Sequence, residues 1–203
     1  MPEPGRNNHG AAPAGSGSLL VHACCAPCST VALERLRVQW RLGFFFYGPN
    51  IHPAAEYRQR LEEMRRFCNA EGVQLLEGEY RPADWGRAIL PWRHLPEGSR
   101  RCQECFRLRL RRTAEEARRR NFDAFGVTLT VSRHKNSRLV IETGRQVEAE
   151  SGVPFVDVDL KKQAGFERSL QLSRQWGFYR QQYCGCSLSR SEGLARRRRR
   201  AGA

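Results

Sequence analysis

The chain has 203 residues, enough for one domain with a buried core. No apolar run approaches the roughly 20 residues that a membrane-spanning helix needs, so we expect no membrane-embedded part. The formal net charge is +14, of which the five arginines at 196–200 contribute only +5. A basic excess spread over the whole chain predicts a polyanionic partner, with nucleic acid as the first candidate. A genome that favours arginine would produce the same excess.

Three regions are expected along the chain. Residues 1–17 are rich in Gly, Pro, Ala and Asn and lack an apolar stretch, which indicates a disordered leader and not a secretory signal. Residues 18–190 are predicted to form a single α/β catalytic domain, and residues 191–203 a solvated, disordered, arginine-rich tail. We expect a cytoplasmic protein, in which grouped cysteines serve more often as metal ligands or catalytic thiols than as disulfides.

Strands and helices are predicted to alternate within the central region. Apolar runs predict strands at 18–23, 42–47, 73–76, 122–129 and 153–158. Helical spacing predicts helices at 29–40, 53–70, 82–90, 102–119 and 136–151, followed by helical or irregular chain at 166–183. This alternation predicts an α/β fold with a mostly parallel sheet and helices on both faces. Ligands bind such sheets beyond the carboxyl ends of the strands, so cysteines that follow the first strand predict a cysteine-rich site at that edge.

Most of the eight cysteines fall into three tight groups. The groups are Cys24 and Cys25 with Cys28 close behind, the Cys102–Cys105 pair, and the Cys184–Cys186 pair. Thiolates gathered by the fold bind soft metals or iron–sulfur clusters, or exchange electrons as a disulfide. For the first group the alternative is a set of small residues that fill a tight turn after a strand.

The groups favour different chemistry. Cys102 and Cys105 open a helix and face one side of it, so a metal or cluster shared with the first group is the leading interpretation. Cys184 and Cys186 flank Gly185, which permits a tight turn, and they are either a redox pair or two further ligands. Cys68 lies alone on the apolar stripe of its helix and is predicted to be a core residue.

Two polar segments are candidates for RNA contact. Residues 128–136 (TLTVSRHKN) follow a strand and offer donors for phosphate or base edges. The alternative is an ordinary helix N-cap, supplied by Asn136 or Ser137. Residues 179–183 combine aromatic rings, an arginine and amides, which suits stacking on a base, although they could also form a structured C-terminal cap. The residues predicted to contact RNA are Arg133, Lys135, Asn136, Tyr179, Arg180 and Gln181.

Five segments occur in a familiar order: HACCAPC, FFYGPNIHP, RCQECFRLRL, TLTVSRHKN and GFERSLQLSRQWGFYRQQYCGC. Over about residues 19–189 the chain resembles the QueH-type epoxyqueuosine reductases. The resemblance implies a Rossmann-like fold and the last step of queuosine biosynthesis, the reductive removal of the epoxide oxygen of epoxyqueuosine in tRNA to give queuosine. It also implies an electron donor, which the sequence does not identify.

The resemblance further implies cofactors. Cys24, Cys25, Cys102 and Cys105 match the cysteines that hold a 4Fe-4S cluster in the family, and Cys184 and Cys186 match its redox-active pair. Some members are described with an additional mononuclear iron, and some carry Asp where this chain has Cys28, so Cys28 is a candidate ligand of a second metal.

Epoxide removal needs two electrons and two protons, which a dithiol together with a cluster could supply. His22, Asp84 and His134 are the candidate proton donors. No glycine-rich phosphate loop follows a strand, so we expect no ATP chemistry. The competing hypotheses are a noncatalytic, zinc-stabilised RNA-binding protein and a metal-free thiol–disulfide exchanger, which would leave the first two cysteine groups without a purpose.

Overall fold

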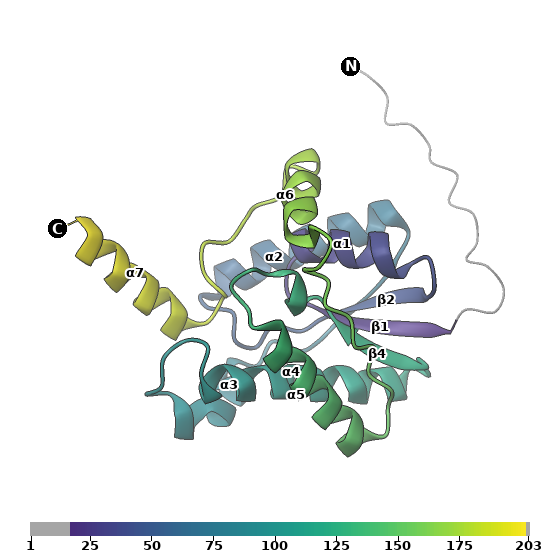
Figure 1. Ribbon diagram of the computed structural model, residues 1–203, viewed down its shortest axis with the longest axis horizontal. Helices are drawn as coiled ribbons and strands as arrows, with labels where there is room; N and C mark the ends of the chain where they lie inside the picture. Colours follow the sequence, from purple (N-terminus) through teal and green to yellow (C-terminus); the bar gives the residue numbers. More distant parts are fainter. Residues whose placement is uncertain (1–16, 202–203) are drawn as a thin grey trace.

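The computed structural model describes residues 17–201. Apart from Gly17, the predicted leader lies outside the described residues, and it stays a prediction. The sheet has four parallel strands in the order β3-β2-β1-β4, of which β2, β1 and β4 are labelled side by side in Figure 1. They are β1 (Ser18–Ala23), β2 (Arg41–Phe46), β3 (Gln74–Glu77) and β4 (Ala124–Val127). The predicted parallel sheet is therefore confirmed.

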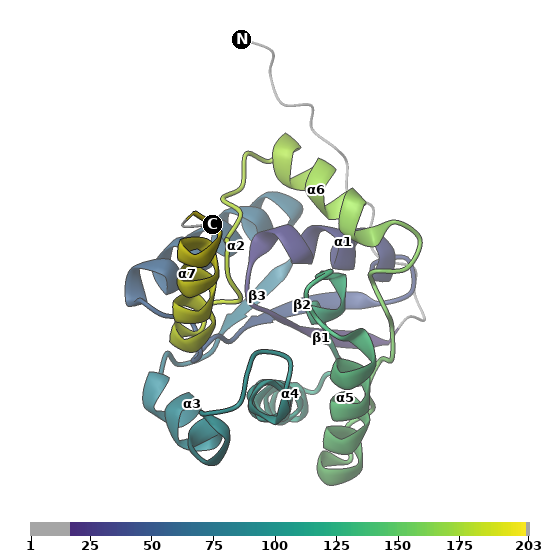
Figure 2. The same cartoon turned by 60° about the vertical axis from the view of Figure 1, so that its left-hand side comes forward.

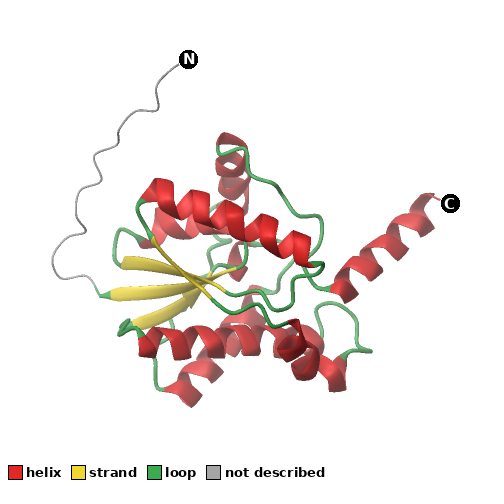
Figure 3. Ribbon diagram, turned by 180° about the vertical axis from the view of Figure 1, so that it is seen from behind, coloured by secondary structure: helices red, strands yellow, loops and turns green. Residues whose placement is uncertain are grey.

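Helices cover both faces of the sheet (Figures 2 and 3). One face carries α1 (Ala26–Leu36) and α2 (Ala54–Glu71), with α6 (Gly165–Gln175) against α1; the other carries α3 (Pro82–Ile89), α4 (Arg100–Arg119) and α5 (Ser137–Ser151). Short 3-10 turns follow α3 and β4, at Leu90–Trp92 (η1) and Leu129–Val131 (η2). Every residue of β1 is buried, as a strand covered on both faces requires. The predicted α/β fold class is confirmed.

Local chemistry fixes several helix ends. The Asn136 side chain accepts a hydrogen bond from the Leu139 N–H at 3.3 Å and so caps α5, which bears out its N-cap interpretation. The left-handed backbone of Gly72 ends α2, with φ of 63°. Helix α1 begins at Ala26, three residues before the predicted start, because Pro27 suits the first turn of a helix.

Two predicted features differ from the structure. The strand expected at 153–158 is reduced to an isolated parallel bridge between Phe155 and Phe125, and Pro154 has no N–H with which to extend the pairing. The disordered tail is also a wrong prediction for its described part, because α7 (Ser187–Ala201) is helical and projects from the body of the molecule (Figure 1). Within residues 17–201, no helix is long and apolar enough to cross a membrane.

Candidate active site: a cysteine-lined cavity

A cavity of about 910 Å³ lies where β1 and β4, neighbours in the sheet but not in sequence, reach their carboxyl ends. Its wall includes residues that directly follow these strands, among them Cys24 after β1 and Thr128 after β4. This is the position at which open α/β sheets bind ligands. The volume is at the upper end of the range of about 300–1,000 Å³ for small-molecule sites, so the cavity has room for a nucleoside.

Seven of the eight cysteines line this one cavity. They are Cys24, Cys25, Cys28, Cys102, Cys105, Cys184 and Cys186. The fold thus brings together the three groups that the sequence separates by tens of residues. All eight cysteines are free thiols.

The first group lies in the turn from β1 into α1, with Cys24 and Cys25 buried. A hydrogen bond with Cys25, together with burial, raises the pKa of Cys24 well above its usual value. A hydrogen bond with Cys24 acts to lower the pKa of Cys25, but the bond with Cys28 and burial outweigh it and raise that pKa to about 12. Cys25 is thus hydrogen-bonded to both of its cysteine neighbours, and the raised pKa values keep Cys24 and Cys25 protonated at neutral pH.

The second group opens α4, where Cys102 and Cys105 are both buried to 9% exposure. The Gly98 N–H donates to the Cys102 sulfur at 3.2 Å, and burial raises the pKa of Cys105. In the described part of the chain, no three His, Cys, Asp or Glu side chains are already placed as a metal-ligand set. The cysteines share the cavity wall without forming a closed ligand cage.

The third group brings two sulfur atoms close together. The Sγ atoms of Cys184 and Cys186 lie 3.6 Å apart, and Gly185 between them has φ of 118°, so the tight turn expected for a glycine is present. The hydrogen bond from Cys186 lowers the pKa of Cys184 well below its usual value, with help from the positive charge of Lys135. A thiolate beside a thiol at this distance needs only a small movement to form a disulfide.

Buried cations surround the sulfur atoms. Arg109 is 3% exposed, and its guanidinium interacts electrostatically with the thiols of Cys24, Cys102, Cys105 and Cys184. Among residues 17–201, no carboxylate forms an ion pair with Arg109. Arg101 is equally buried, and although it pairs with Glu192, its Nε and Nη2 have no hydrogen-bond partner. Buried cations of this kind require anionic neighbours.

These observations fit the group that the family resemblance implies. Cysteine thiolates are the soft ligands that hold iron–sulfur clusters. Coordination would place thiolate anions beside Arg109, which has no carboxylate partner among residues 17–201, and near the Arg101 nitrogens that Glu192 leaves without a partner. Cys24, Cys25, Cys102 and Cys105 all line the cavity and would supply four such donors.

Arg60 ties the third group to α2. This arginine has no exposed surface and forms an ion pair with Glu56 at 2.7 Å. The same guanidinium donates to the backbone carbonyls of Tyr183 at 3.4 Å and Cys184 at 3.5 Å. A Cβ atom on Gly185 would approach the Arg60 Nη1 to 3.3 Å, so the loop and the arginine are closely packed. The Arg60–Glu56 pair therefore fixes the backbone of the Cys-Gly-Cys turn.

The residues predicted to contact RNA divide into two sets. Arg133, Lys135, Arg180 and Gln181 line the cavity, and the Gln181 amide donates to the Cys25 sulfur at 3.3 Å. Two others do not line it: Asn136 caps α5, and the Tyr179 hydroxyl donates to Glu56 at 3.0 Å. RNA contact stays a prediction for all six residues.

Two cavity cations share one aromatic ring. The guanidinium carbons of Arg133 and Arg180 lie 5.2 and 5.9 Å from the ring centroid of Phe166. Arginines stacked in this way keep free N–H groups for phosphate or base edges. Phe166 at the start of α6 is a cavity residue that the sequence analysis did not single out.

The three candidate proton donors lie in different environments. Burial, with the charge of Arg109 as the second cause, lowers the pKa of His22 to about 3, and its Nε2 contacts the Tyr47 carbonyl outside the cavity. Asp84 forms an ion pair with Arg87, also outside the cavity. Only His134 of the three lines the cavity.

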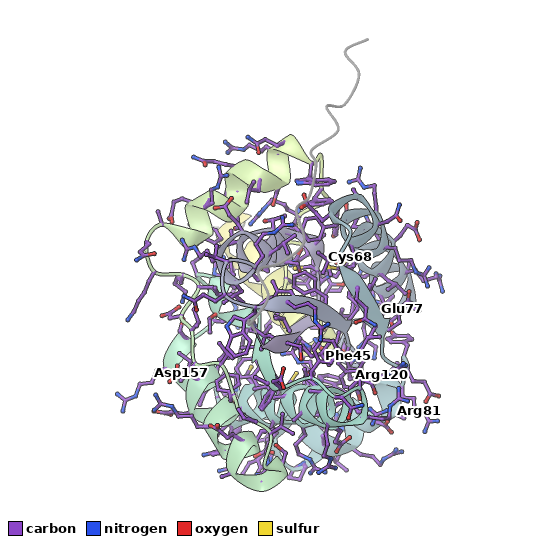
Figure 4. All side chains as sticks on the ribbon, turned by 90° about the vertical axis from the view of Figure 1, so that its right-hand side faces the viewer. Phe45, Cys68, Glu77, Arg81, Arg120 and Asp157 are labelled. Atoms are coloured by element: carbon purple, nitrogen blue, oxygen red, sulfur yellow. The ribbon has the colours of Figure 1, made fainter. Side chains whose placement is uncertain are left out.

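Cys68 lies on α2 (Figure 4). It is 2% exposed and is not among the residues that line the cavity. Its predicted place in the core is confirmed, and burial raises its pKa to about 12. We expect Cys68→Ala to leave the metal content of the purified protein unchanged and to cost about 1 kcal/mol of stability, since it removes one buried atom. Elemental analysis and thermal unfolding measure both effects. Loss of metal from a folded Cys68→Ala variant would show that Cys68 is a ligand.

A family model described as epoxyqueuosine reductase QueH matches residues 19–192. This chain belongs to the QueH family of epoxyqueuosine reductases. A relative of that name from Thermotoga maritima is 36% identical over 176 residues, which cover 85% of this chain and 90% of the relative. A relative from Streptococcus pyogenes is 38% identical over 83% of this chain and 69% of the relative. A relative from Dehalococcoides mccartyi is 32% identical over 86% of this chain and 93% of the relative. The family resemblance is confirmed.

The sequence analysis missed the buried cations of this QueH-family site. Arg109 follows Cys102 and Cys105 at positions i+7 and i+4 of the same helix, so it falls on the cysteine face of α4. An arginine on a buried helical face is the signal that could have marked it. Arg60 is a similar case, because it directly precedes Leu61, a residue of the apolar stripe of α2.

Proposed function

We propose that this protein is an iron–sulfur epoxyqueuosine reductase that removes the epoxide oxygen of epoxyqueuosine in tRNA at the cysteine-lined cavity. Membership of the QueH family makes it an oxidoreductase of queuosine biosynthesis. The observation that carries the site assignment is the gathering of seven cysteines on one cavity beside buried cations.

Each cysteine group has a role in this proposal. Cys24, Cys25, Cys102 and Cys105 hold a 4Fe-4S cluster, and Cys28 is available to a second iron. When bound, such iron centres supply electrons, and an open iron site can polarise an oxygen atom. Cys184 and Cys186 form the redox pair: oxidation of the two thiols to a disulfide releases the two electrons and two protons that convert the epoxide into an alkene and water.

The polar wall of the cavity receives the nucleotide. Arg133 and Arg180, which both stack on Phe166, bind phosphate or a base edge, and His134 is the candidate proton donor that lines the cavity. The reaction is assigned to the cytoplasm, where free thiols persist. Family membership does not favour the noncatalytic zinc protein, because the matched proteins are named as reductases.

The decisive assay uses tRNA that carries epoxyqueuosine. The protein is purified and incubated with this tRNA and dithionite without oxygen, and the digested nucleosides are analysed by mass spectrometry. We expect epoxyqueuosine to lose one oxygen atom and become queuosine. Unchanged epoxyqueuosine after incubation with metal-loaded protein would contradict the proposal.

Helix α7 supplies a second test, on RNA affinity. The family match ends at residue 192, and Arg197, which lies beyond it, lines the cavity and donates to Gln182 at 2.8 Å. Removal of residues 194–203 deletes five arginines and retains the Glu192–Arg101 pair. We expect tRNA affinity to fall about tenfold at physiological salt, with a shallower salt dependence and unchanged turnover at saturating tRNA. Filter binding across a salt series measures this. Abolished turnover at saturating tRNA would show that α7 takes part in the chemistry.

A further inference from the structure

A second cavity, of about 490 Å³, lies on the outer side of the redox pair. It is formed by α3, the 3-10 turn η1 and the first turn of α7, which lie on one side of the molecule (Figure 2). Its apolar wall includes Trp85, Ile89, Leu90 and Leu188. We call it the outer cavity.

A single layer of side chains separates the outer cavity from the cysteines. Trp85 lines both cavities. Trp85 and Ile89 form one buried apolar cluster with Cys105 and Cys186, and Leu188 packs against that cluster. The redox pair is therefore in contact with the wall of the outer cavity as well as with the cysteine-lined cavity.

Helix α7 begins between the two cavities. Ser187 and Leu188 line the outer cavity, whereas Ser189, Gly193 and Arg197 line the cysteine-lined cavity. A molecule bound at the outer cavity therefore lies on the other side of α7 from the site that receives the tRNA. The redox pair thus lies between the cysteine-lined cavity and the outer cavity, with the Trp85 and Ile89 side chains between it and the outer cavity.

The rim of the outer cavity is cationic and its centre is apolar. Its only charged lining residues within the described chain are Arg87 and Arg93. Arg87 pairs with Asp84, but Arg93 makes no ion pair among the residues that the structure describes. Leu90, which lies between Arg87 and Arg93 in the sequence, is 57% exposed. Protein interfaces typically have an apolar centre and charged residues at the rim. Phosphate contacts, by contrast, do not need an exposed leucine, so these features favour a protein partner.

We propose that the outer cavity docks an acidic electron-carrier protein that reduces the Cys184–Cys186 disulfide. This inference rests on the proposed function, in which the reaction leaves that disulfide behind. The carrier supplies two electrons, in one or two encounters, and solvent supplies two protons. The S–S bond breaks, two thiols form, and the carrier is oxidised. A small interface of this kind suits a transient redox encounter.

The test compares two reductants. Arg93→Glu and Leu90→Glu variants are assayed with dithionite and with a plant-type ferredoxin kept reduced by its NADPH-dependent reductase. We expect the ferredoxin-supported rate at limiting ferredoxin to fall about tenfold or more, because steered association of charged partners changes on this scale. The dithionite-supported rate and the KM for tRNA should stay unchanged.

The matched controls carry the same changes at the far edge of the sheet. Arg118→Glu lies near the end of α4, and Val38→Glu replaces a residue that is 71% exposed after α1. Both controls should retain the wild-type ferredoxin-supported rate. Equal rates in the Arg93 variant and wild type would overturn the proposal, and so would an equal loss with dithionite, which would place these residues in tRNA binding or folding.

A binding measurement keeps this test separate from the proposed function. Calorimetric titration of ferredoxin into the protein needs no turnover, so it decides the docking surface even if no epoxyqueuosine is reduced. We expect binding that weakens about tenfold in Arg93→Glu and in high salt. Ferredoxin that does not bind the wild-type protein would overturn the proposal.

Discussion

Single Cys184→Ser and Cys186→Ser variants are expected to lose epoxyqueuosine reduction by on the order of 10³-fold or more, the scale of removing one member of a catalytic unit. In the unsubstituted protein the Sγ atoms of Cys184 and Cys186 are 3.6 Å apart. A lone thiol supplies only half of the two-electron dithiol couple. Turnover is measured by mass spectrometry of tRNA nucleosides, and iron content is measured on the same samples.

The iron content separates the two roles that the sequence leaves open for this pair. If Cys184 and Cys186 are redox residues, both variants keep the iron of the wild-type protein. If they are ligands, iron is lost together with activity. Cys68→Ser is the matched control, because it makes the same atomic change away from the cavity. Full activity in both serine variants would reject the redox role and the ligand role alike.

Arg60→Met is expected to destabilise the protein by about 3–5 kcal/mol, because it leaves Glu56 as an uncompensated buried carboxylate. It also removes the donors to the carbonyls of Tyr183 and Cys184, so turnover should fall even at temperatures where the variant is folded. Denaturant unfolding measures the first effect, and nucleoside analysis at low temperature measures the second.

Arg65→Met is the matched control on the same helix. Arg65 is half exposed and pairs with Glu77 and Glu62 at the surface, so its loss should change stability little. Arg60→Lys keeps the buried charge without the planar guanidinium, and we expect it to fold better than Arg60→Met while turnover stays reduced. An Arg60→Met protein as stable and as active as wild type would show that the pair does not hold the Cys-Gly-Cys turn.

The sequence predicted the fold well where the pattern is local. The buried strand before Cys24 and the apolar stripe that ends at Cys68 both fall where expected, because periodicity reports burial directly. The run at 153–158 looked equally strand-like, but its pairing depends on the neighbouring strand and on Pro154. The arginine run after Gly193 suggested disorder from its charge, yet arginine is a good helix former and α7 continues through it.

The site was predictable in its donors and not in its electrostatics. Cysteine is rare enough that three groups indicate one shared site, and one cavity does receive all three. Which cations face them depends on how α2 and α4 pack, and no sequence spacing connects Arg60 to residues 183–185. The sequence also could not show that Tyr179 and Gln181 have different partners. The Tyr179 hydroxyl donates to Glu56, whereas the Gln181 amide donates to the Cys25 sulfur.

The most direct measurement is the iron, sulfide and zinc content of the protein purified without oxygen. We expect a brown protein with about four iron and four sulfide ions per chain, and one further iron if Cys28 serves a second metal. Serine at Cys24, Cys25, Cys102 or Cys105 should reduce that content, whereas serine at Cys68 should not. A colourless wild-type protein with stoichiometric zinc and no sulfide would contradict an iron–sulfur reductase.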